Sequence, residues 1–546
     1  MARAQLQVMG LERGAADVQL PSLLWGWPVL CPLAHAEVLA IDAHEAQKDK
    51  RVLVVLTAQT SLHEPATRHQ ALLSSLLSPT VNEAGRVIAL VLAETRQLAS
   101  EAAAKVLVRV RAHSAQLNVT TALASGATLP SLMQKSGQAA EAYLGAPTQL
   151  KQSYRTAARQ LGSTAHGVAT AVWRGDALTL YTIGHPPPEL ATLLGLPSEQ
   201  LLTVVSPLGA KVPAMGPQAL LAAIAAAHLG RPVRIELPAL SACGVVAETV
   251  QTVQLGVGES ELPQALLLHG AVGSSADGSG PALAALMDLM TVYGFAHREL
   301  NVVPVPLHLP SQQRPGEPSG WHELGLSVEL LIDELAQQRA VDPLLLRQRW
   351  LEQTATADGS TLLGCLQLLH KVSGDAKQPA RSSEGLLPRR GCGVASSAHR
   401  ATTGQTLYGA HFVEVELSSE GVTLLRHHCV LAAGQPDRTR DADSVVQRSL
   451  EKARRLALQA ELQVMSRAGW TARHGEDCSR LLSVRHSEVT FLALPSREPL
   501  VASDDDLAML AQSGVAAAMM SALSVALGIR LRRLPIELRA FPSVPK

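Results

Sequence analysis

The chain has 546 residues, 47 basic and 47 acidic side chains, and an aromatic content of only 3%. A zero formal charge without a basic block, together with so few aromatic side chains, argues against a nucleic-acid partner. The length predicts about three to four domains with sizeable cores. Charged residues interrupt the N-terminal segment, and the alanine-rich stretches are too short to span a bilayer. We therefore expect a cytoplasmic chain with no membrane partner.

The cysteines are scattered along the chain without a CxxC pair, at Cys31, Cys243, Cys365, Cys392, Cys429 and Cys478. This spacing argues against a zinc site, an iron–sulfur cluster and a disulfide framework alike. We expect these side chains to be buried thiols.

The N-terminal segment, near residues 15–112, has the pattern of an α/β unit. Alternate side chains predict one half-buried strand, at Trp25, Trp27, Val29 and Cys31. Val52–Thr57 and Val87–Glu94 are apolar runs typical of strands. The phrase AETRQLASEAAAKVLVRV predicts a passage from strand to helix and back.

Small and polar residues dominate between Leu123 and Gly145, and residues 113–150 are therefore interpreted as a linker. Beyond it, residues 178–237 have the pattern strand, helix, strand, loop, helix, strand. The loop Ser206–Met215 follows a strand, and the next helix, Pro217–Leu229, is closed by Gly230. Open α/β sheets usually bind ligands in such loops at the C-terminal ends of strands.

The remaining elements continue the α/β pattern. Predicted helices cover residues 281–293, 324–335, 362–372, 441–463 and 513–527, and predicted strands cover residues 266–269, 489–495 and 529–538. Asp342 and Pro343 are a favourable N-cap and N1 pair for a further helix.

Three short motifs do not carry a ligand site. The Gly/Ser loop at residues 270–280 lacks the order of a phosphate-binding loop. Trp321-His322-Glu323-Leu324 begins like a metalloprotease helix, but the second histidine is absent at the required spacing. His427, His428 and Cys429 are successive residues of a predicted strand, so their side chains alternate between faces and cannot all bind one metal ion.

Several phrases together resemble the molybdopterin subunit of xanthine dehydrogenases and aldehyde oxidases. They are LGLPSEQLLTVVSPLGAKV with GRPVRIEL, AETRQLASEAAAK, IDELAQQRAVDPLLLRQR and TLYGAHFVEVELSSEGVTLLRHHCVLAAG. The resemblance implies an α/β hammerhead domain at 15–112 and, after the linker, a first subunit-like α/β domain at 151–390. It also implies a second such domain at 391–546, shortened by an internal deletion.

The site residues of this family are mostly replaced. The family's glycine-rich pterin loop aligns with residues 206–212 and keeps only Gly209 and Lys211. Pro207 and Leu208 remove the freedom that glycine gives a backbone near a pterin. Val212 stands where the family has the glutamate that touches purine substrates.

The other family positions show similar losses. Ungapped counting places Glu317 on the family's substrate-orienting arginine, and Arg314 fits only with an insertion, so we favour loss. Met509 aligns with the glutamate that acts as general base. A thioether cannot take a proton from a metal-bound water. Residues with a weaker claim to the site are Gln160 and His166, Gly434-Gln435-Pro436, which superficially resembles the GQG loop, and Glu498, which aligns with a surface turn.

We therefore expect a non-catalytic relative that acts as a binding or assembly component of a molybdenum hydroxylase complex, with no catalytic residue, no metal ligand and no bound molybdopterin. Its partners would be iron–sulfur and FAD subunits or a catalytic paralogue, within an oligomer. The alternative is an active molybdenum-dependent oxidoreductase that hydroxylates a purine, another N-heterocycle or an aldehyde. It would pass electrons to a separate iron–sulfur subunit. A third hypothesis, an unrelated hydrolase, is not supported, because the sequence has no GxSxG motif.

Overall fold

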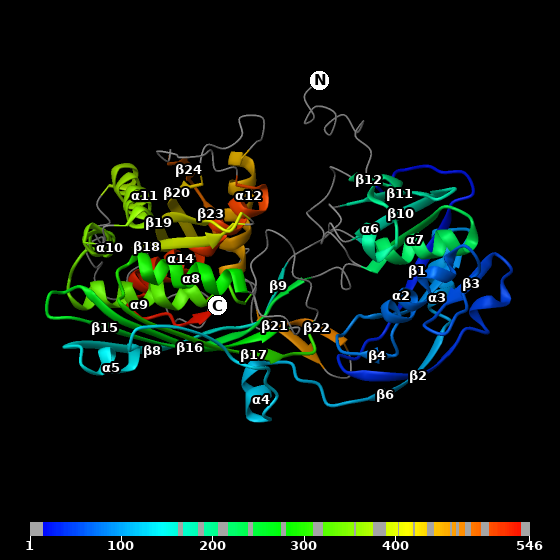
Figure 1. Cartoon of the computed structure of the whole chain (residues 1–546), viewed down its shortest axis with the longest axis horizontal. Helices are drawn as coiled ribbons and strands as arrows, with labels where there is room; N and C mark the ends of the chain where they lie inside the picture. Colours follow the sequence, from blue (N-terminus) through cyan, green and yellow to red (C-terminus); the bar gives the residue numbers. More distant parts are fainter. Residues whose placement is uncertain are drawn as a thin grey trace, which may run out of the picture.

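The computed structural model describes residues 15–161, 167–183, 190–205, 217–237, 244–274, 280–309, 320–353, 356–374, 389–401, 403–418, 421–433, 442–458, 461–465, 469–474, 482–492 and 502–536. It confirms the predicted α/β fold class, with an N-terminal α/β unit and a larger α/β body. Figure 1 shows the N-terminal unit and strands β10 to β12 at one end of the molecule and the larger body at the other.

A seven-stranded sheet joins the N-terminal unit to the segment that follows residue 166. Its order is β12-β11-β10-β13-β1-β5-β3. The strands are β1 (Leu24–Leu30), β3 (Val52–Leu56), β5 (Val87–Ala93), β10 (Gly167–Arg174), β11 (Ala177–Thr182), β12 (Leu201–Val205) and β13 (Val233–Leu237). β1 pairs in parallel with β13, from Leu24 opposite Val233 to Gly26 opposite Ile235. The predicted hammerhead unit therefore shares its sheet with residues 167–237.

Both faces of this sheet are covered, which explains the alternation in β1. Val29 and Cys31 belong to the core beneath helix α3 (Arg96–Ala103), and Trp25 and Trp27 pack against that core. Leu24 belongs to the opposite core, which contains the alanine-rich helix α7 (Pro217–Leu229). The remaining elements of this end are β2 (Ala36–Asp42), β4 (Thr80–Val81), β6 (Leu107–Ala112), α2 (Gln70–Leu76), α6 (Leu190–Leu193) and the 3-10 turns Ala46–Lys48, Ala66–His69 and Ser198–Gln200.

The second sheet has six strands in the order β25-β8-β15-β16-β17-β7. They are β7 (Leu132–Ser136), β8 (Thr148–Thr156), β15 (Thr249–Val257), β16 (Pro263–Ser274), β17 (His297–Pro306) and β25 (Arg533–Leu534). A separate two-stranded sheet is formed by β9 (Arg159–Leu161), which follows β8 in the chain, and β14 (Gly244–Val246), which precedes β15. Helix α9 (Leu324–Gln338) packs on this sheet, and all four predicted face residues, Leu324, Val328, Leu331 and Leu335, are fully buried.

The predicted linker at 113–150 differs from the structure. It contains α4 (Val119–Ala124), β7, α5 (Ala139–Leu144) and the start of β8, and β7 pairs with β17 from Arg298 opposite Ser136 to Val302 opposite Leu132. Because β7 is an edge strand, none of its side chains is fully buried, and it needs few apolar residues. Its polar composition suggested a linker for this reason.

The third sheet lies between two layers of helices. Its strands are β18 (Arg389–Arg400), β19 (Thr406–Ser418), β20 (Gly421–Ala432), β23 (Leu482–Val484) and β24 (Ser487–Phe491). One face packs against α8 (Gly280–Val292), α10 (Pro343–Glu352) and α11 (Ala357–Ser373). The other packs against α12 (Ala442–Leu458), α13 (Asp504–Ser513) and α14 (Val515–Leu527).

Two glycines let α14 lie directly on β18. A Cβ atom at Gly391 would lie 2.1 Å from the carbonyl oxygen of Ala522, and one at Gly393 would lie 2.1 Å from that of Ala518. The two glycines are two positions apart on a strand and therefore face the same side. These two glycines of β18 therefore serve helix packing.

The C-terminal predictions need three corrections. The helix predicted over 441–463 ends at Leu458, and residues 461–465 form β21, which pairs with β22 (Gly469–His474). This pairing overrides the helix propensity of the sequence. The strand predicted at 489–495 is β24, which begins two residues earlier at Ser487. Of the strand predicted at 529–538, only Arg533–Leu534 is paired in the described residues.

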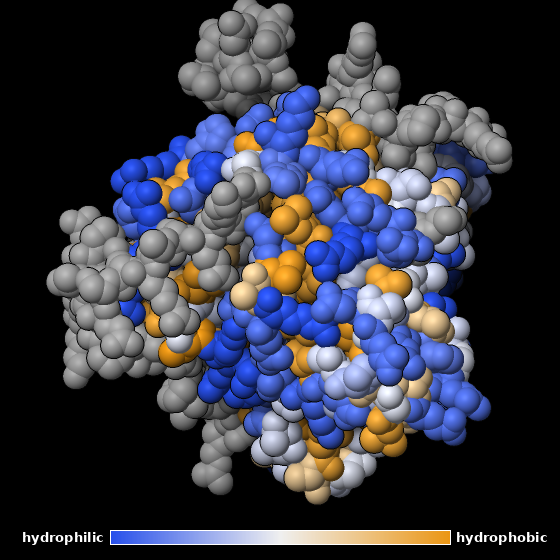
Figure 2. Space-filling view, turned by 90° about the vertical axis from the view of Figure 1, so that its left-hand side faces the viewer, coloured by the Kyte–Doolittle hydropathy of each residue, from blue (hydrophilic) through white to orange (hydrophobic). Residues whose placement is uncertain are grey.

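One helical stretch, Asp504–Leu527, is long and apolar enough to cross a membrane, but 83% of its most apolar window is buried inside the molecule. It is divided at Gly514 into α13 and α14, which belong to the core against the third sheet. We therefore interpret it as core structure. On the end of the molecule that carries α5, α10 and α11, hydrophobic residues are interspersed among hydrophilic ones (Figure 2).

A buried ionic group holds α9, α10 and the third sheet together. The guanidinium of Arg347 donates to Glu329 at 2.9 Å and to Asp333 at 2.6 Å, and all three side chains are at most 3% exposed. Glu329 also accepts hydrogen bonds from the Tyr293 hydroxyl at 2.9 Å and from the Ser396 backbone N–H at 2.8 Å. Because every charge has a partner, burial of this group is compatible with a stable core.

Candidate functional site

Met509, which the sequence analysis aligned with the family's general base, lies on helix α13. Its N-cap is Ser503, whose Oγ accepts from the Asp506 N–H at 3.1 Å, while the Asp506 carboxylate accepts from the Ser503 N–H at 3.2 Å. Asp504, Asp505 and Asp506 in the first turn complement the helix dipole. Met509 follows within this helix, and its side chain is only 5% exposed.

Asp506 also links α13 to strand β18. One of its carboxylate oxygens lies 3.1 Å from Nε2 of His399. Burial alone would raise the pKa of Asp506, but hydrogen bonds from His399 and Ser503 outweigh it and lower the pKa to about 2. The aspartate is therefore ionised throughout the physiological range.

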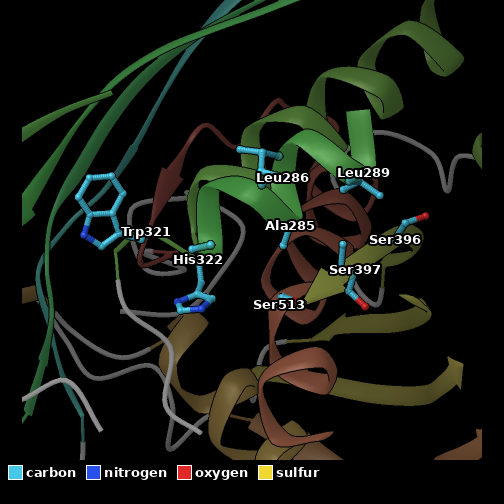
Figure 3. Close-up of a pocket in the computed structure, with 11 residues that line it drawn as sticks. Ala285, Leu286, Leu289, Trp321, His322, Ser396, Ser397 and Ser513 are labelled. Atoms are coloured by element: carbon cyan, nitrogen blue, oxygen red, sulfur yellow. The ribbon is translucent and has the colours of Figure 1, made fainter. Parts of the chain in front are cut away.

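A small cavity lies beside β18, between α8, the turn before α9 and the end of α13. Its lining includes Ala285, Leu286, His322, Ser397 and Ser513, and Figure 3 shows His322 and Ser397 approaching it from different elements. Its volume is about 30 Å³, which is room for about two water molecules.

The Ser397 hydroxyl, on a residue that lines this cavity, is buried and has no hydrogen-bond partner among the described residues. The Trp321 indole nitrogen is also buried without a partner there, but its ring points away from the other lining residues in Figure 3. His322 lies near His399, with ring centroids 6.3 Å apart. Burial and the neighbouring His399 lower the pKa of His322 to about 3, so its imidazole is neutral. The cavity is thus a place for water rather than for a charged ligand.

The Asp506, His399 and Ser397 side chains do not form a hydrolase triad. The aspartate and histidine are in contact, but within the described part of the chain Ser397 makes no hydrogen bond to a base that would activate a nucleophile. The geometry therefore gives no support to the hydrolase hypothesis.

A second polar chain crosses the third sheet nearby. The Arg454 Nε–H donates to Nδ1 of His427 at 3.0 Å, and Nε2 of His427 lies 3.4 Å from Nδ1 of His411. Because His427 accepts from arginine, its proton is on the other ring nitrogen and points to His411. Both rings are fully buried, and burial together with Arg454 lowers the pKa of His411 to about 3. These residues connect α12 to the sheet as neutral rings beside one cation.

The structure separates the residues of the HHC phrase as the strand pattern predicted. His427 faces Arg454 and α12, whereas His428 lies near His486 and Glu488 on β24. In the WHEL phrase, α9 begins only at Leu324, so His322 and Glu323 precede the helix, and Glu323 pairs with Arg159. Of the cysteines, Cys31, Cys365, Cys392 and Cys429 are free and buried, as expected.

Other predicted site positions lie outside the described residues. They are residues 206–212 with Val212, Arg314 and Glu317, His166, Gly434-Gln435-Pro436, Glu498, Cys243 and Cys478. Gln160 is placed in β9 by its backbone only. Met509 is therefore the one aligned position whose surroundings the described part of the chain shows.

The comparisons with known proteins agree with this architecture. Residues 10–113 match the family model described as the a/b hammerhead domain of aldehyde oxidase and xanthine dehydrogenase. The aldehyde oxidoreductase molybdenum-binding subunit PaoC of Escherichia coli (strain K12) is 27% identical over 385 residues, which are 67% of this chain and 51% of that protein. The chain is a homologue of molybdenum-binding subunits of aldehyde oxidoreductases. This confirms the resemblance. The chain spans about half the length of the curated relatives it matches.

Solved structures show the same fold. The aldehyde oxidoreductase of Desulfovibrio gigas superposes with a TM-score of 0.80 at 15% identity, over 98% of this chain and 79% of that one. Quinoline 2-oxidoreductase of Pseudomonas putida 86 gives 0.78 at 14% identity, over 100% and 97%. The reconstituted CO dehydrogenase of Oligotropha carboxidovorans gives 0.77 at 12% identity, over 99% and 96%. At these identities the likeness is one of fold.

The described residues of this chain do not fit the base catalysis that a molybdopterin site requires at the position aligned with the general base. Met509 offers a thioether on a buried helix, and this group cannot accept a proton near neutral pH. The cavity beside α13 has about 30 Å³, whereas ligand pockets usually have about 300–1,000 Å³. We therefore derive no catalytic step through this cofactor.

Sequence reasoning missed the polar contacts around α13. His399 and Asp506 are 107 residues apart, and no local pattern links them. The S-D-D-D phrase does carry a signal, because serine followed by an acidic residue three positions later predicts a capping box and thus the start of α13.

Proposed function

We propose that this chain is a non-catalytic homologue of the molybdopterin subunit and serves in the cytoplasm as a binding or assembly component of a molybdenum hydroxylase complex. One observation carries the proposal: Met509, at the position aligned with the general base, is a buried thioether within α13. General base catalysis is typically worth about 10²–10⁴ in rate, and the described residues provide no substitute carboxylate in the cavity beside this helix.

The retained framework supports a binding role. The sheets and helix layers enclose large continuous hydrophobic cores. The N-terminal unit and strands β10 to β13 also form one seven-stranded sheet. The buried group around Arg347 is completely paired as well. A chain selected for folding and association, without selection for chemistry, keeps such features and loses site residues.

The proposed partners are iron–sulfur and FAD subunits or a catalytic paralogue, in an oligomer. The cysteines of the described residues are buried and free. Burial raises the pKa of the Cys365 thiol to about 12. A neutral buried thiol is a poor cluster ligand. These four described thiols are therefore poor candidates for cluster ligands, and the proposal assigns iron–sulfur centres to a partner subunit.

The alternative is an active oxidoreductase that binds molybdopterin and hydroxylates a purine, another N-heterocycle or an aldehyde. The names of its relatives favour this reading, because PaoC is a molybdenum-binding subunit of an aldehyde oxidoreductase. This alternative requires that the general base is a residue other than Met509 and that the pterin is bound by a loop other than residues 206–212.

Molybdenum content separates the two functions. The full chain would be purified from its own host, and PaoC from a host that makes the cofactor would serve as the positive control. We expect molybdenum far below one atom per chain, and no turnover of purines or aldehydes with an artificial electron acceptor. Near-stoichiometric molybdenum together with turnover would overturn the proposal. Co-expression with the host's iron–sulfur and FAD subunits, followed by size-exclusion chromatography, tests the assembly role.

A further inference from the structure

Three potential metal ligands meet at the edge of the third sheet, away from the cavity beside α13. They are His428 on β20 and His486 and Glu488 in the HSE phrase at the start of β24. β24 pairs in parallel with β20, and His428 is directly opposite Glu488. His486 is two residues before Glu488, so both side chains project to the same side of an extended chain.

The residue between these two ligands fixes the strand from the opposite side. The Ser487 hydroxyl donates to Gln447 of α12 at 2.9 Å, and the Gln447 amide donates to the Ser487 carbonyl at 3.1 Å. The backbone N–H of His427 donates to the carbonyl of His486 at 3.0 Å. These bonds hold His486 and Glu488 in place before any ion binds, which reduces the entropy cost of assembling a site.

The distances fit a tetrahedral metal ion. Nδ1 of His428 lies 3.3 Å from Oε2 of Glu488, and Nε2 of His486 lies 3.5 Å from the same oxygen. The three ligand atoms all lie within 4.8 Å of one another. With zinc–ligand bonds of about 2.0–2.2 Å, ligand atoms at tetrahedral angles are about 3.3–3.6 Å apart.

The interior member of the group, His428, has a buried ring nitrogen without a hydrogen-bond partner among the described residues. His428 is 6% exposed, and this nitrogen, Nδ1, lies near Glu488. The contact has the distance of two ligands of one ion without the geometry of a hydrogen bond. A buried polar nitrogen without a partner costs stability, and a bound ion removes that cost.

The other two ligands leave the site open to solvent. The side chains of His486 and Glu488 are 55% and 49% exposed. An ion can therefore enter from the surface, and a fourth position remains for water. Two imidazoles and one carboxylate favour a transition metal over Mg²⁺ or Ca²⁺, which prefer oxygen ligands alone.

We propose that His428, His486 and Glu488 bind one divalent transition-metal ion, with Zn²⁺ as the best fit, and that this ion fixes strand β24 to β20. No metal ligand was predicted from the sequence, because the cysteines lack a ligand spacing and the side chains of His427, His428 and Cys429 alternate between the faces of a strand. The predicted strand also began at residue 489, so the alternation of His486 and Glu488 was hidden. The site is independent of the proposed function, since neither molybdenum nor turnover enters its test.

The test uses the full chain without a histidine tag, stripped of metals with a chelator and titrated with Zn²⁺ by calorimetry. We expect the wild type to bind one equivalent that His486→Ala and Glu488→Gln weaken by more than about tenfold, because even outer-shell partners of a metal are worth about 10–100-fold. Both substitutions are at exposed positions and should leave the circular dichroism spectrum unchanged.

The matched control is His269→Ala. His269 is 44% exposed and lies 3.1 Å from Glu299, so it is a surface histidine–carboxylate pair without a second histidine. Its loss should leave zinc binding unchanged. Co²⁺ provides a second readout, since a tetrahedral site gives intense visible absorption bands that His486→Ala should abolish. The proposal fails if the wild type binds no zinc, or if the two site variants bind it as tightly as the His269 control.

Discussion

His399 on β18 and Asp506 in the first turn of α13 lie 3.1 Å apart, although 107 residues separate them in the chain. The same aspartate closes the capping box with Ser503. One carboxylate therefore holds the start of α13 and attaches it to the third sheet, and this double role predicts a pH-dependent stability.

We expect Asp506→Asn to destabilise the fold at neutral pH. The folded pKa is lowered from 3.8 to about 2, and a shift of this size corresponds to about 2 kcal/mol of unfolding free energy. Because the folded pKa is depressed, this contribution is fully present above about pH 4 and is lost as the pH falls toward about 2. Urea unfolding of both proteins should therefore show a difference at neutral pH that shrinks in acid.

Asp505→Asn is the matched control, since it makes the same charge change in the same helical turn at a partly exposed position. It should cost only a few tenths of a kcal/mol, the usual value for a surface charge near a helix N-terminus. Equal losses for the two variants would show that the helix dipole, and not the contact with His399, determines the effect.

Removal of Arg347 should be far more costly than removal of a surface arginine. Arg347→Ala leaves the buried carboxylates of Glu329 and Asp333 without their cation, which typically costs about 3–5 kcal/mol. Arg349→Ala breaks only an exposed pair with Glu261 at 3.3 Å and should cost less than about 1 kcal/mol. Thermal unfolding monitored by calorimetry compares them, and similar melting temperatures would contradict the prediction.

Gly393→Ala should disrupt the contact between α14 and β18. The added Cβ would lie 2.1 Å from the Ala518 carbonyl oxygen and 2.5 Å from the Ala522 nitrogen, which are backbone atoms that cannot rotate away. Overpacking usually costs about 1–3 kcal/mol, and backbone contact places this variant at the upper end or beyond. Gly145→Ala is the control, because its nearest neighbour would be 3.4 Å away and its φ is −81°. An unchanged midpoint for Gly393→Ala in urea would refute the packing argument.

Helix ends were predictable because their signals are local. The N-cap side chain of Asp342 accepts from Leu344 N–H at 2.7 Å, as the Asp-Pro pair predicted. Gly230 and Gly528 close α7 and α14 with φ of +60° and +71°. The end of α12 was not predictable in this way, since the strand β21 forms only through its partner β22.

The candidate site was less accessible to sequence reasoning. The resemblance located Met509, and the structure places it in a buried helix. The polar contact of this helix with the third sheet joins residues far apart in the chain, His399 and Asp506. Such polar pairs have no periodicity, so a hydrophobic pattern that predicts the core does not predict them.

Met509→Glu tests whether the missing base alone explains the proposed loss of catalysis. The resemblance implies three coexisting changes: Met509 in place of the base, Val212 in place of the substrate-binding glutamate, and Pro207-Leu208 within the pterin loop. Each affects a different requirement, and a base cannot act on a cofactor that is not bound. We expect no hydroxylation of purines or aldehydes by Met509→Glu, even combined with Val212→Glu, in assays with an artificial electron acceptor.

Stability measurements make this negative result informative. A carboxylate at a position only 5% exposed, without a designed partner, should destabilise the fold by several kcal/mol unless it takes up a proton. Met509→Leu conserves volume and should cost less than about 1.5 kcal/mol. If Met509→Glu instead folds as stably as wild type and the double variant turns over substrate, the helix environment already accommodates a catalytic carboxylate and the cofactor site has survived. Turnover by the wild type would remove the non-catalytic proposal altogether, because Met509 would then stand in a working active site.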